Sequence, residues 1–165
     1  QFLFLDTNPF VQKYYTYGEK YPELKNFAEQ VSKEDWKQQL KWLESSLKNC
    51  DADWKIVVGH HPVLSGGKHG NTKELEEYVK PLLEKYGVQM YICGHDHDIQ
   101  YLKENGVNYL VSGAGSELRP TGSIPQTVYS ASINGFLSSK ITGKNAELKY
   151  KSVTGETLYQ TIINR

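Results

Sequence analysis

Two short apolar runs, each closed by a glycine and followed by histidines, constrain most strongly how this chain folds. The first is "IVVGHHP", residues 56–62, and the second is "MYICGHDH", residues 90–97. Short apolar runs that end at a glycine are typical of buried strands. A stretch with helical spacing separates the two runs, which is the order of a strand–helix–strand unit. The pattern therefore predicts an α/β fold built on a layered sheet.

The segments on either side extend this prediction. Residues 2–5 predict another buried strand, and residues 7–31 predict a loop with one short helix. Ser32 resembles the N-cap of a helix that ends near Asn49. A further helix is expected to begin near Asn71, with a kink or break at its internal proline. The apolar residues that share a face of the helix after Ser32 are Trp36, Leu40, Leu43 and Leu47.

The C-terminal part of the chain predicts mainly strands. Residues 98–102 and 108–113 are expected to pair through a tight "ENG" turn. A Gly-, Ser- and Pro-rich loop, residues 113–126, follows them. The expected fold is therefore an α/β sheet flanked by helices, with a β meander at its C-terminal end. The expected meander strands lie within residues 128–142, 146–153 and 157–164.

Composition limits the classes of partner. The 165 residues carry no formal net charge, and 23% are charged and 38% hydrophobic. This is typical of one globular domain and gives no electrostatic argument for a nucleic-acid or membrane-surface partner. No apolar run approaches the roughly 20 residues that span a bilayer. Cys93 is expected to be a buried small hydrophobe, so the two cysteines leave the compartment open.

All five histidines follow the two glycine-closed strands: His60, His61, His69, His95 and His97. Ligands of open α/β sheets bind beyond the carboxyl ends of the strands. If the two strands are neighbours, the imidazoles converge on one edge of the sheet, and the glycines allow a sharp turn there. Imidazole suits Zn, Fe, Mn or Cu, so the pattern indicates a metal site.

The carboxylates do not complete that site. Asp96, between two histidines, is expected to point away from a metal and to orient a ligand histidine or cap the turn. Asp51, Asp53 and Asp98 are close in sequence to the histidines, but none has metal-ligand spacing at a strand end. From the residues alone, the prediction stops at a histidine-rich and incomplete metal site.

The same blocks resemble a known family. "VVGHHPV" and "CGHDHDIQYL" are similar to the last two signature blocks of the calcineurin-like metallophosphoesterases, and more narrowly of the purple, or tartrate-resistant, acid phosphatases. The resemblance continues in "LKWLESSL", "LLEKYGVQMYICGHDH", "NGVNYLVSGAGS" and "SVTGETLYQT". It implies a metallophosphoesterase β-sandwich flanked by helices, and an acid phosphatase that hydrolyses phosphomonoesters by metal-activated hydroxide.

The resemblance also implies roles for the histidines. His60 and His95 would bind a divalent Fe, Zn or Mn ion, and His97 would bind a ferric ion. His69, in "KHGNT", would face the substrate phosphate and help to protonate the leaving group. His61 matches no ligand position, because the family usually has an aromatic residue there, and it is expected to form a wall of the substrate pocket.

The first three signature blocks of the family have no counterpart in the chain. It has no Gly-Asp-x-Gly, Gly-Asp-x-x-Tyr or Gly-Asn-His motif, and Asp6 resembles a strand residue of the middle of the domain. Residues 1–165 therefore resemble the C-terminal half of the domain, a processed or truncated piece that opens inside a strand. A binuclear centre of Fe with Fe, Zn or Mn would be incomplete here, and little phosphatase activity is expected from the chain alone.

The resemblance further implies partners and a location. An N-terminal half of the same enzyme is the expected partner, and a partnered or homo-oligomeric chain is expected rather than a monomer. A secreted, lysosomal, vacuolar or periplasmic location follows from the family and not from the residues. Two alternatives remain: another metallophosphoesterase, such as a phosphodiesterase or nucleotidase, and a non-catalytic metal-binding module.

Overall fold

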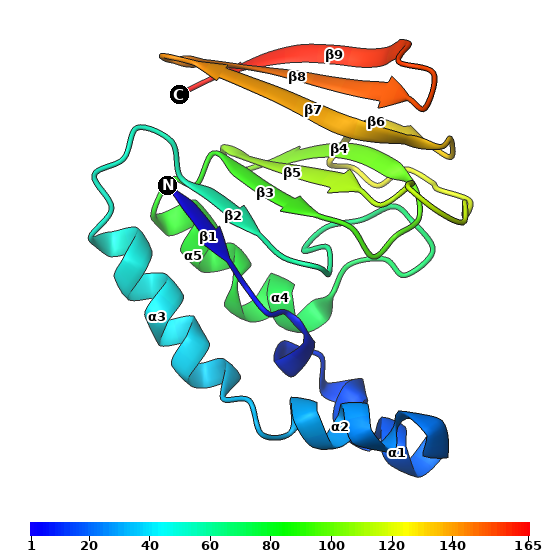
Figure 1. Cartoon of the computed structure of the whole chain (residues 1–165). Helices are drawn as coiled ribbons and strands as arrows, with labels where there is room; N and C mark the ends of the chain where they lie inside the picture. Colours follow the sequence, from blue (N-terminus) through cyan, green and yellow to red (C-terminus); the bar gives the residue numbers. More distant parts are fainter.

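The computed structural model describes residues 1–165 and contains two sheets (Figure 1). The larger sheet has six strands in the order β1-β2-β3-β5-β4-β6, and the smaller has three in the order β7-β8-β9. The strands of the larger sheet are β1 (Phe2–Phe4), β2 (Ile56–Val58), β3 (Met90–Cys93), β4 (Ile99–Glu104), β5 (Val107–Ser112) and β6 (Thr127–Ala131). Those of the smaller sheet are β7 (Gly135–Thr142), β8 (Asn145–Ser152) and β9 (Thr157–Asn164).

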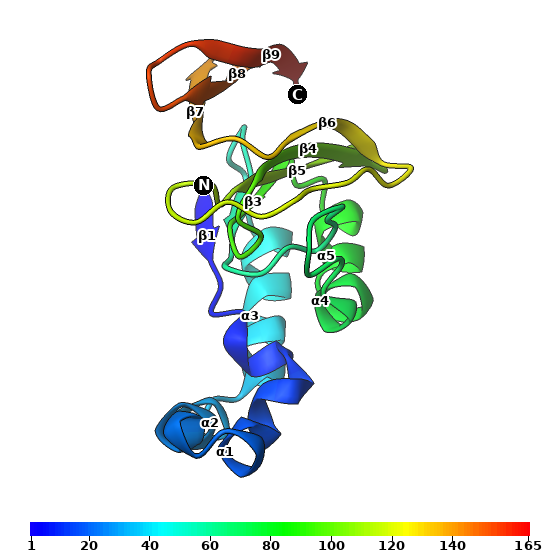
Figure 2. The ribbon, with the colours of Figure 1, turned by 90° about the vertical axis from the view of Figure 1, so that its right-hand side faces the viewer.

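Helices cover one face of the six-stranded sheet, and the β7–β9 sheet covers the other (Figures 1 and 2). The covering helices are α3 (Trp36–Lys48), α4 (Lys73–Tyr78) and α5 (Lys80–Lys85). Two short helices, α1 (Tyr17–Lys20) and α2 (Lys25–Val31), extend away from the sheet near one end of α3. Three 3₁₀ segments lie among them: η1 (Asn8–Phe10), η2 (Gln12–Thr16) and η3 (Pro22–Leu24). The predicted layered α/β fold with a C-terminal meander is confirmed.

The layers enclose two hydrophobic cores. The core beneath the helices joins Leu43 of α3 and Leu83 of α5 to Tyr91 of β3, all of them fully buried. The core between the two sheets joins Met90 of β3 to Tyr150 of β8. Alternate side chains of β3 thus enter different cores, which is why both its faces are apolar. None of the helices combines the length and the apolar character that crossing a bilayer requires.

Two helix predictions differ from the structure or are refined by it. The N-cap of α3 is Asp35 and not Ser32, because the Asp35 carboxylate accepts hydrogen bonds from the amides of Lys37 and Gln38, each at 3.0 Å. The helix expected from Asn71 divides at Val79 into α4 and α5. Pro81 lies in the first turn of α5, where its missing amide hydrogen costs least.

Residues 8–31 are more helical than the sequence pattern predicts. The segment consists of short 3₁₀ and α turns rather than one helix in a loop. Its members pack on a small core of their own, formed by Val11, Tyr14 and Val31. Turns of three to seven residues are too short to display a hydrophobic period, so the pattern could not reveal them.

The sheet order brings the ends of β1, β2 and β3 together. β1 pairs parallel to β2, and β2 pairs parallel to β3 with Val58 opposite Ile92. The residues after each strand therefore emerge at one edge of the sheet, as the histidine pattern requires. The predicted tight turn between β4 and β5 is present, with positive φ angles at Asn105 (47°) and Gly106 (84°).

Candidate metal centre

The centre is built around His60, after β2, and His95, after β3. The Nε2 atom of His60 lies 3.1 Å from the Nδ1 atom of His95. With metal–nitrogen bonds of about 2.0–2.1 Å, two imidazoles on one ion place their nitrogens roughly 2.9–3.3 Å apart. The pair is therefore spaced as two ligands of a single ion, and in the absence of an ion the same distance allows a hydrogen bond.

The backbone around these histidines is unusual in two places. His95 has φ = 65°, a left-handed conformation that few residues other than glycine adopt. A Cβ atom at Gly59 would lie 2.7 Å from the Thr7 methyl group and would also collide with the Tyr91 hydroxyl. Gly59 is thus required for close packing, whereas at the second block the strained position is His95 itself and not Gly94.

His61 is held by hydroxyl groups on both sides of its ring. The Thr7 Oγ1 atom lies 2.8 Å from Nδ1, and the Tyr14 hydroxyl lies 2.7 Å from Nε2. Thr7 Oγ1 also accepts the amides of His60 and His61, so its own proton is donated to Nδ1 of His61. The His61 proton therefore resides on Nε2 and is donated to Tyr14.

This network decides the role of His61. Ligand nitrogens of His60, His61 and His95 all lie within 4.8 Å of one another, so proximity alone would make His61 a third ligand. Both of its nitrogens are already engaged, and its side chain is buried. His61 instead positions the chain after β2, and it also borders a cavity of about 280 Å³.

His97, the other predicted ligand, has a buried ring nitrogen without a partner. Its Nδ1 atom makes no hydrogen bond, and the nearest carboxylate, that of Glu117, is 3.9 Å away. A buried imidazole nitrogen left unpaired costs about 1–3 kcal/mol. This orphaned atom is what a site prepared for a further ligand or ion would show.

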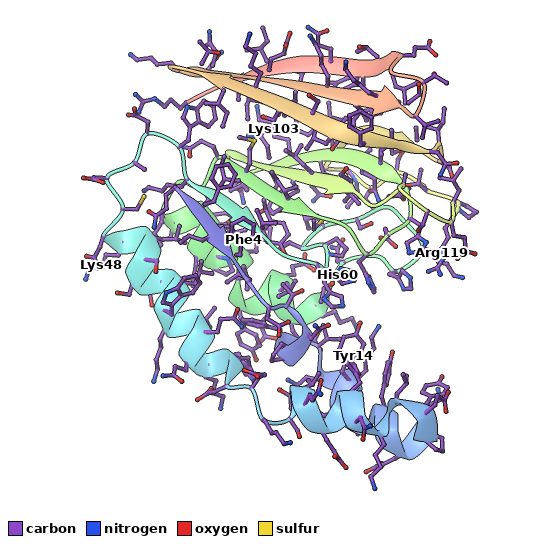
Figure 3. All side chains as sticks on the ribbon, in the orientation of Figure 1. Phe4, Tyr14, Lys48, His60, Lys103 and Arg119 are labelled. Atoms are coloured by element: carbon purple, nitrogen blue, oxygen red, sulfur yellow. The ribbon has the colours of Figure 1, made fainter.

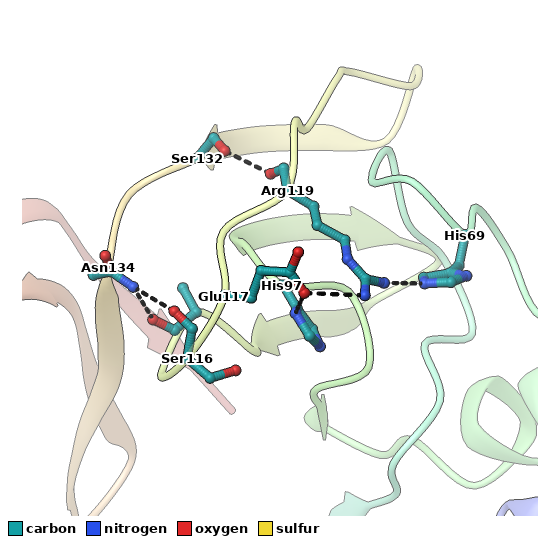
Figure 4. A network of polar contacts seen from close by, with 8 residues as sticks. His69, His97, Ser116, Glu117, Arg119, Ser132 and Asn134 are labelled. Atoms are coloured by element: carbon teal, nitrogen blue, oxygen red, sulfur yellow. Dashed lines mark hydrogen bonds and ion pairs between the residues drawn. The ribbon is translucent and has the colours of Figure 1, made fainter.

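His69 lies beside His95 on the loop that follows β2. The two rings are 4.4 Å apart between centroids, and His69 is exposed at the rim of the 280 Å³ cavity. Lys13, Lys73 and Glu74 also border that cavity, so its formal charge is positive by one, which is compatible with an anion. The Nε2 atom of His69 contacts Arg119 Nη1 at 2.9 Å (Figure 4).

A buried polar network supports the loop that carries His69. The Asp96 carboxylate is fully buried, accepts a hydrogen bond from the Ser65 hydroxyl, and accepts the His69 amide at 2.9 Å. Gln100 donates to both Ser65 and Asp98. Asp96 therefore points away from the imidazole cluster and orders the His69 loop, and Asp98 is engaged within the same network.

Burial lowers the pKa of each histidine in the cluster. Desolvation, strengthened by His69 and His60, lowers the pKa of His95 to about 4. Burial and the neighbouring imidazoles lower the pKa of His61 to about 3. The pKa values of His60 and His69 are lowered mainly by burial as well. Near neutral pH the rings are therefore neutral, which is the form that binds metals.

The residues present fit a divalent metal. They supply two converging imidazole nitrogens and a third imidazole with an orphaned nitrogen. Nitrogen ligands suit Zn and Fe(II). A ferric ion also needs hard oxygen ligands, and both buried aspartates of this region, Asp96 and Asp98, are engaged elsewhere.

The structure brings together all five predicted site residues. Figure 3 shows His60 and Arg119 toward the same end of the sheet, with Tyr14 beneath His60 in this view. Thr7, Tyr14 and Arg119 were not predicted from the sequence. Thr7 follows β1 as the histidines follow β2 and β3, and this signal could have identified it. The prediction of a buried strand at residues 2–5 was wrong in one respect, because β1 lies at the edge of the sheet and only Leu3 of its three residues is buried. Arg119 lies 50 residues from its partner His69, and no local pattern connects the two.

Comparison with known proteins identifies the family of the chain. The family model "Calcineurin-like phosphoesterase" matches residues 3–98. Purple acid phosphatase 17 of Arabidopsis thaliana is 36% identical over all of this chain and 51% of its own length. Tartrate-resistant acid phosphatase type 5 of Oryctolagus cuniculus is 41% identical over 74% of this chain and 41% of its own length.

A solved structure is similar over nearly the whole chain. GAP50, described as the anchor in the inner membrane complex of Plasmodium, has a TM-score of 0.74 and 26% identity. The similarity covers 99% of this chain and 48% of GAP50. The chain thus spans about half the length of the relatives it matches, and the half concerned is the C-terminal one. By sequence and structure, the chain belongs to the calcineurin-like phosphoesterase family, with purple acid phosphatases as its homologues.

Proposed function

We propose that this chain supplies the C-terminal metal ligands of a binuclear acid phosphatase that hydrolyses phosphomonoesters. The observation that carries the proposal is the 3.1 Å approach of His60 Nε2 and His95 Nδ1, next to His69 and an anion-compatible cavity. The homology to purple acid phosphatases supports it.

The histidines divide between metal binding and proton transfer. His60 and His95 would hold a divalent Fe, Zn or Mn ion, and His97 would contribute to a ferric site. When bound, such a metal pair lowers the pKa of water and polarises the phosphoryl oxygens. His69, exposed beside His95, is placed to donate a proton to the leaving oxygen. His61 keeps the loop of His60 in place and borders the substrate cavity.

We further propose that turnover requires an N-terminal half of the enzyme. The centre offers imidazoles but lacks free carboxylates with which to hold a ferric ion. β1 is an edge strand of the sheet, and its Phe2 and Phe4 side chains are 56% and 68% exposed. Their rings stack at 6.4 Å and form an apolar patch that a partner segment would cover.

The test compares metal binding with turnover. His60→Ala and His95→Ala are expected to lose most of the affinity for Zn²⁺ or Co²⁺, measured by calorimetry. His61→Phe, which retains an aromatic ring, is expected to keep that affinity within a few-fold. Equal loss in His61→Phe, with the stability to urea unchanged so that the loop of His60 is still held in place, would make His61 a ligand and contradict the assignment.

Two alternatives predict different results. A phosphodiesterase or nucleotidase would hydrolyse a diester or a nucleotide faster than a simple monoester once both halves are combined. A non-catalytic metal-binding module would bind metal without turnover even after an N-terminal half is added. The structural similarity to GAP50, whose description names an anchor, favours the second of these alternatives over the first.

A further inference from the structure

Arg119 places a guanidinium group at the rim of the metal centre, between His69 and Glu117 (Figure 4). Its Nη1 atom lies 2.9 Å from His69 Nε2, and its Nη2 atom lies 3.4 Å from Glu117 Oε2. The chain contains 17 lysines but only two arginines, and the other, Arg165, forms an ion pair with Asp53 away from the site.

The loop that carries Arg119 is fixed on both sides. The Arg119 amide donates to the His97 carbonyl at 3.0 Å, and the Ser132 hydroxyl donates to the Arg119 carbonyl. Further along the loop, the Gly122 amide donates to the Gly66 carbonyl at 2.8 Å. Arg119 is therefore anchored directly to the backbone of a predicted metal ligand, and only its side chain is free to change partners.

The contacts of the guanidinium show what it is suited to bind. A guanidinium can only donate hydrogen bonds, so Nε2 of His69 acts as the acceptor. It carries five N–H groups in a planar fork, and the contacts to His69 and Glu117 use only part of them. The fork matches a phosphate better than any other side chain does, because it can bond two oxygens at once.

We propose that Arg119 binds a non-bridging oxygen of the substrate phosphate and that Glu117 opposes this binding. Phosphate entering beside His69 would replace His69 or Glu117 as the partner of the guanidinium, and no covalent bond forms or breaks in this exchange. Because the Glu117 carboxylate is an anion that holds the same guanidinium, it competes with the phosphate. This inference deepens the proposed phosphatase function and rests on it.

The test measures phosphate affinity in the metal-loaded enzyme assembled from this chain and an N-terminal half. Inorganic phosphate is the probe, by calorimetry and as a competitive inhibitor of monoester hydrolysis. Arg119→Met is expected to weaken phosphate binding and raise KM about 10- to 100-fold, because a charged hydrogen bond is lost. Arg119→Lys retains the charge but not the planar fork of N–H groups, so its phosphate affinity should lie between those of the unmodified enzyme and Arg119→Met.

Two further variants separate binding from a purely structural role. Glu117→Gln is expected to tighten phosphate binding about two- to five-fold, as befits an exposed competing charge. Arg165→Met removes the same charge and volume far from the site and should leave phosphate affinity unchanged. If the contact between Glu117 and Arg119 served only to hold the loop in place, Glu117→Gln would weaken phosphate binding and would not tighten it.

Different results would contradict the phosphate-binding role of Arg119 and the proposed phosphatase function. If the unmodified enzyme neither hydrolyses monoesters nor binds phosphate, the proposed function fails and this inference fails with it. If it does both, and Arg119→Met retains its phosphate affinity, Arg119 is not a phosphate-binding residue. Weaker phosphate binding in Glu117→Gln would likewise overturn the competing role of Glu117.

Discussion

The Thr7 hydroxyl holds His60 and His61 in position. Replacing Thr7 by valine tests this role. The Thr7 side chain is buried, and its hydroxyl joins three groups. It accepts the amides of His60 at 3.2 Å and His61 at 3.1 Å, and it donates to His61 Nδ1 at 2.8 Å. Valine has the same shape without the hydroxyl, so all three contacts are lost while the volume stays the same.

The magnitude follows from the number of groups left unpaired. The His61 amide and the His61 Nδ1 atom are both buried, and each costs about 1–3 kcal/mol when unsatisfied. Allowing for partial relaxation, Thr7→Val is expected to lower the free energy of unfolding by about 2–4 kcal/mol. For a domain of this size that corresponds to a fall in Tm of about 5–15 °C.

Thr7→Ser is the matched control, because it keeps the hydroxyl and loses one methyl group, worth about 0.8 kcal/mol. Both variants are compared by urea denaturation and by Zn²⁺ affinity. Supporting groups behind a metal ligand typically contribute about 10- to 100-fold to affinity, so Zn²⁺ should bind correspondingly more weakly to Thr7→Val. Equal stability and equal Zn²⁺ affinity in the two variants would refute the role assigned to the Thr7 hydroxyl.

Three further predictions concern the scaffold. Gly59→Ala should destabilise the protein by about 1–3 kcal/mol in urea titrations, because its Cβ would overlap the Thr7 methyl. Asp35→Ala should cost about 1 kcal/mol in the same assay, since α3 loses its N-cap. The hydrogen bond and ion pair with Lys80 lower the pKa of Glu104 in the folded protein. The ionised Glu104 therefore stabilises the fold fully above its ordinary pKa of 4.5, and this stabilisation is lost as the pH falls through the lower pKa of the folded state. Glu104→Gln should therefore flatten the loss of stability below about pH 4.5, and an unchanged pH profile would contradict this.

The strands that carry His60 and His95 could be predicted from the sequence because they depend on local patterns. Apolar runs closed by glycine mark β2 and β3 and a helical stretch separates them, but that the two strands are parallel neighbours is given by the structure alone. Their ends then meet at one edge, and the clustering of His60 and His95 follows. The break at Pro81 was predictable for the same reason, because proline acts within its own turn.

The roles of the site residues Thr7 and Arg119 could not be predicted in this way, because they depend on contacts between distant segments. Thr7 and His61 are 54 residues apart, and Arg119 and His69 are 50 apart. The Ser32 cap prediction was wrong because Asp35 competes for the same helix start and its carboxylate reaches two amides. The resemblance to purple acid phosphatases predicted roles for the histidines, but it gave no role to Arg119.

The dependence of catalysis on an N-terminal half is measured by phosphomonoester hydrolysis of this chain with and without that half, both loaded with metal. We expect the 165-residue chain to bind a divalent ion through His60 and His95 but to show little or no turnover. Adding the N-terminal half should restore hydrolysis, and His95→Ala should abolish it again. Turnover by the chain alone at the rate of the assembled enzyme, in material whose intact mass excludes an N-terminal half, would show that catalysis needs no such partner and would overturn the proposed function.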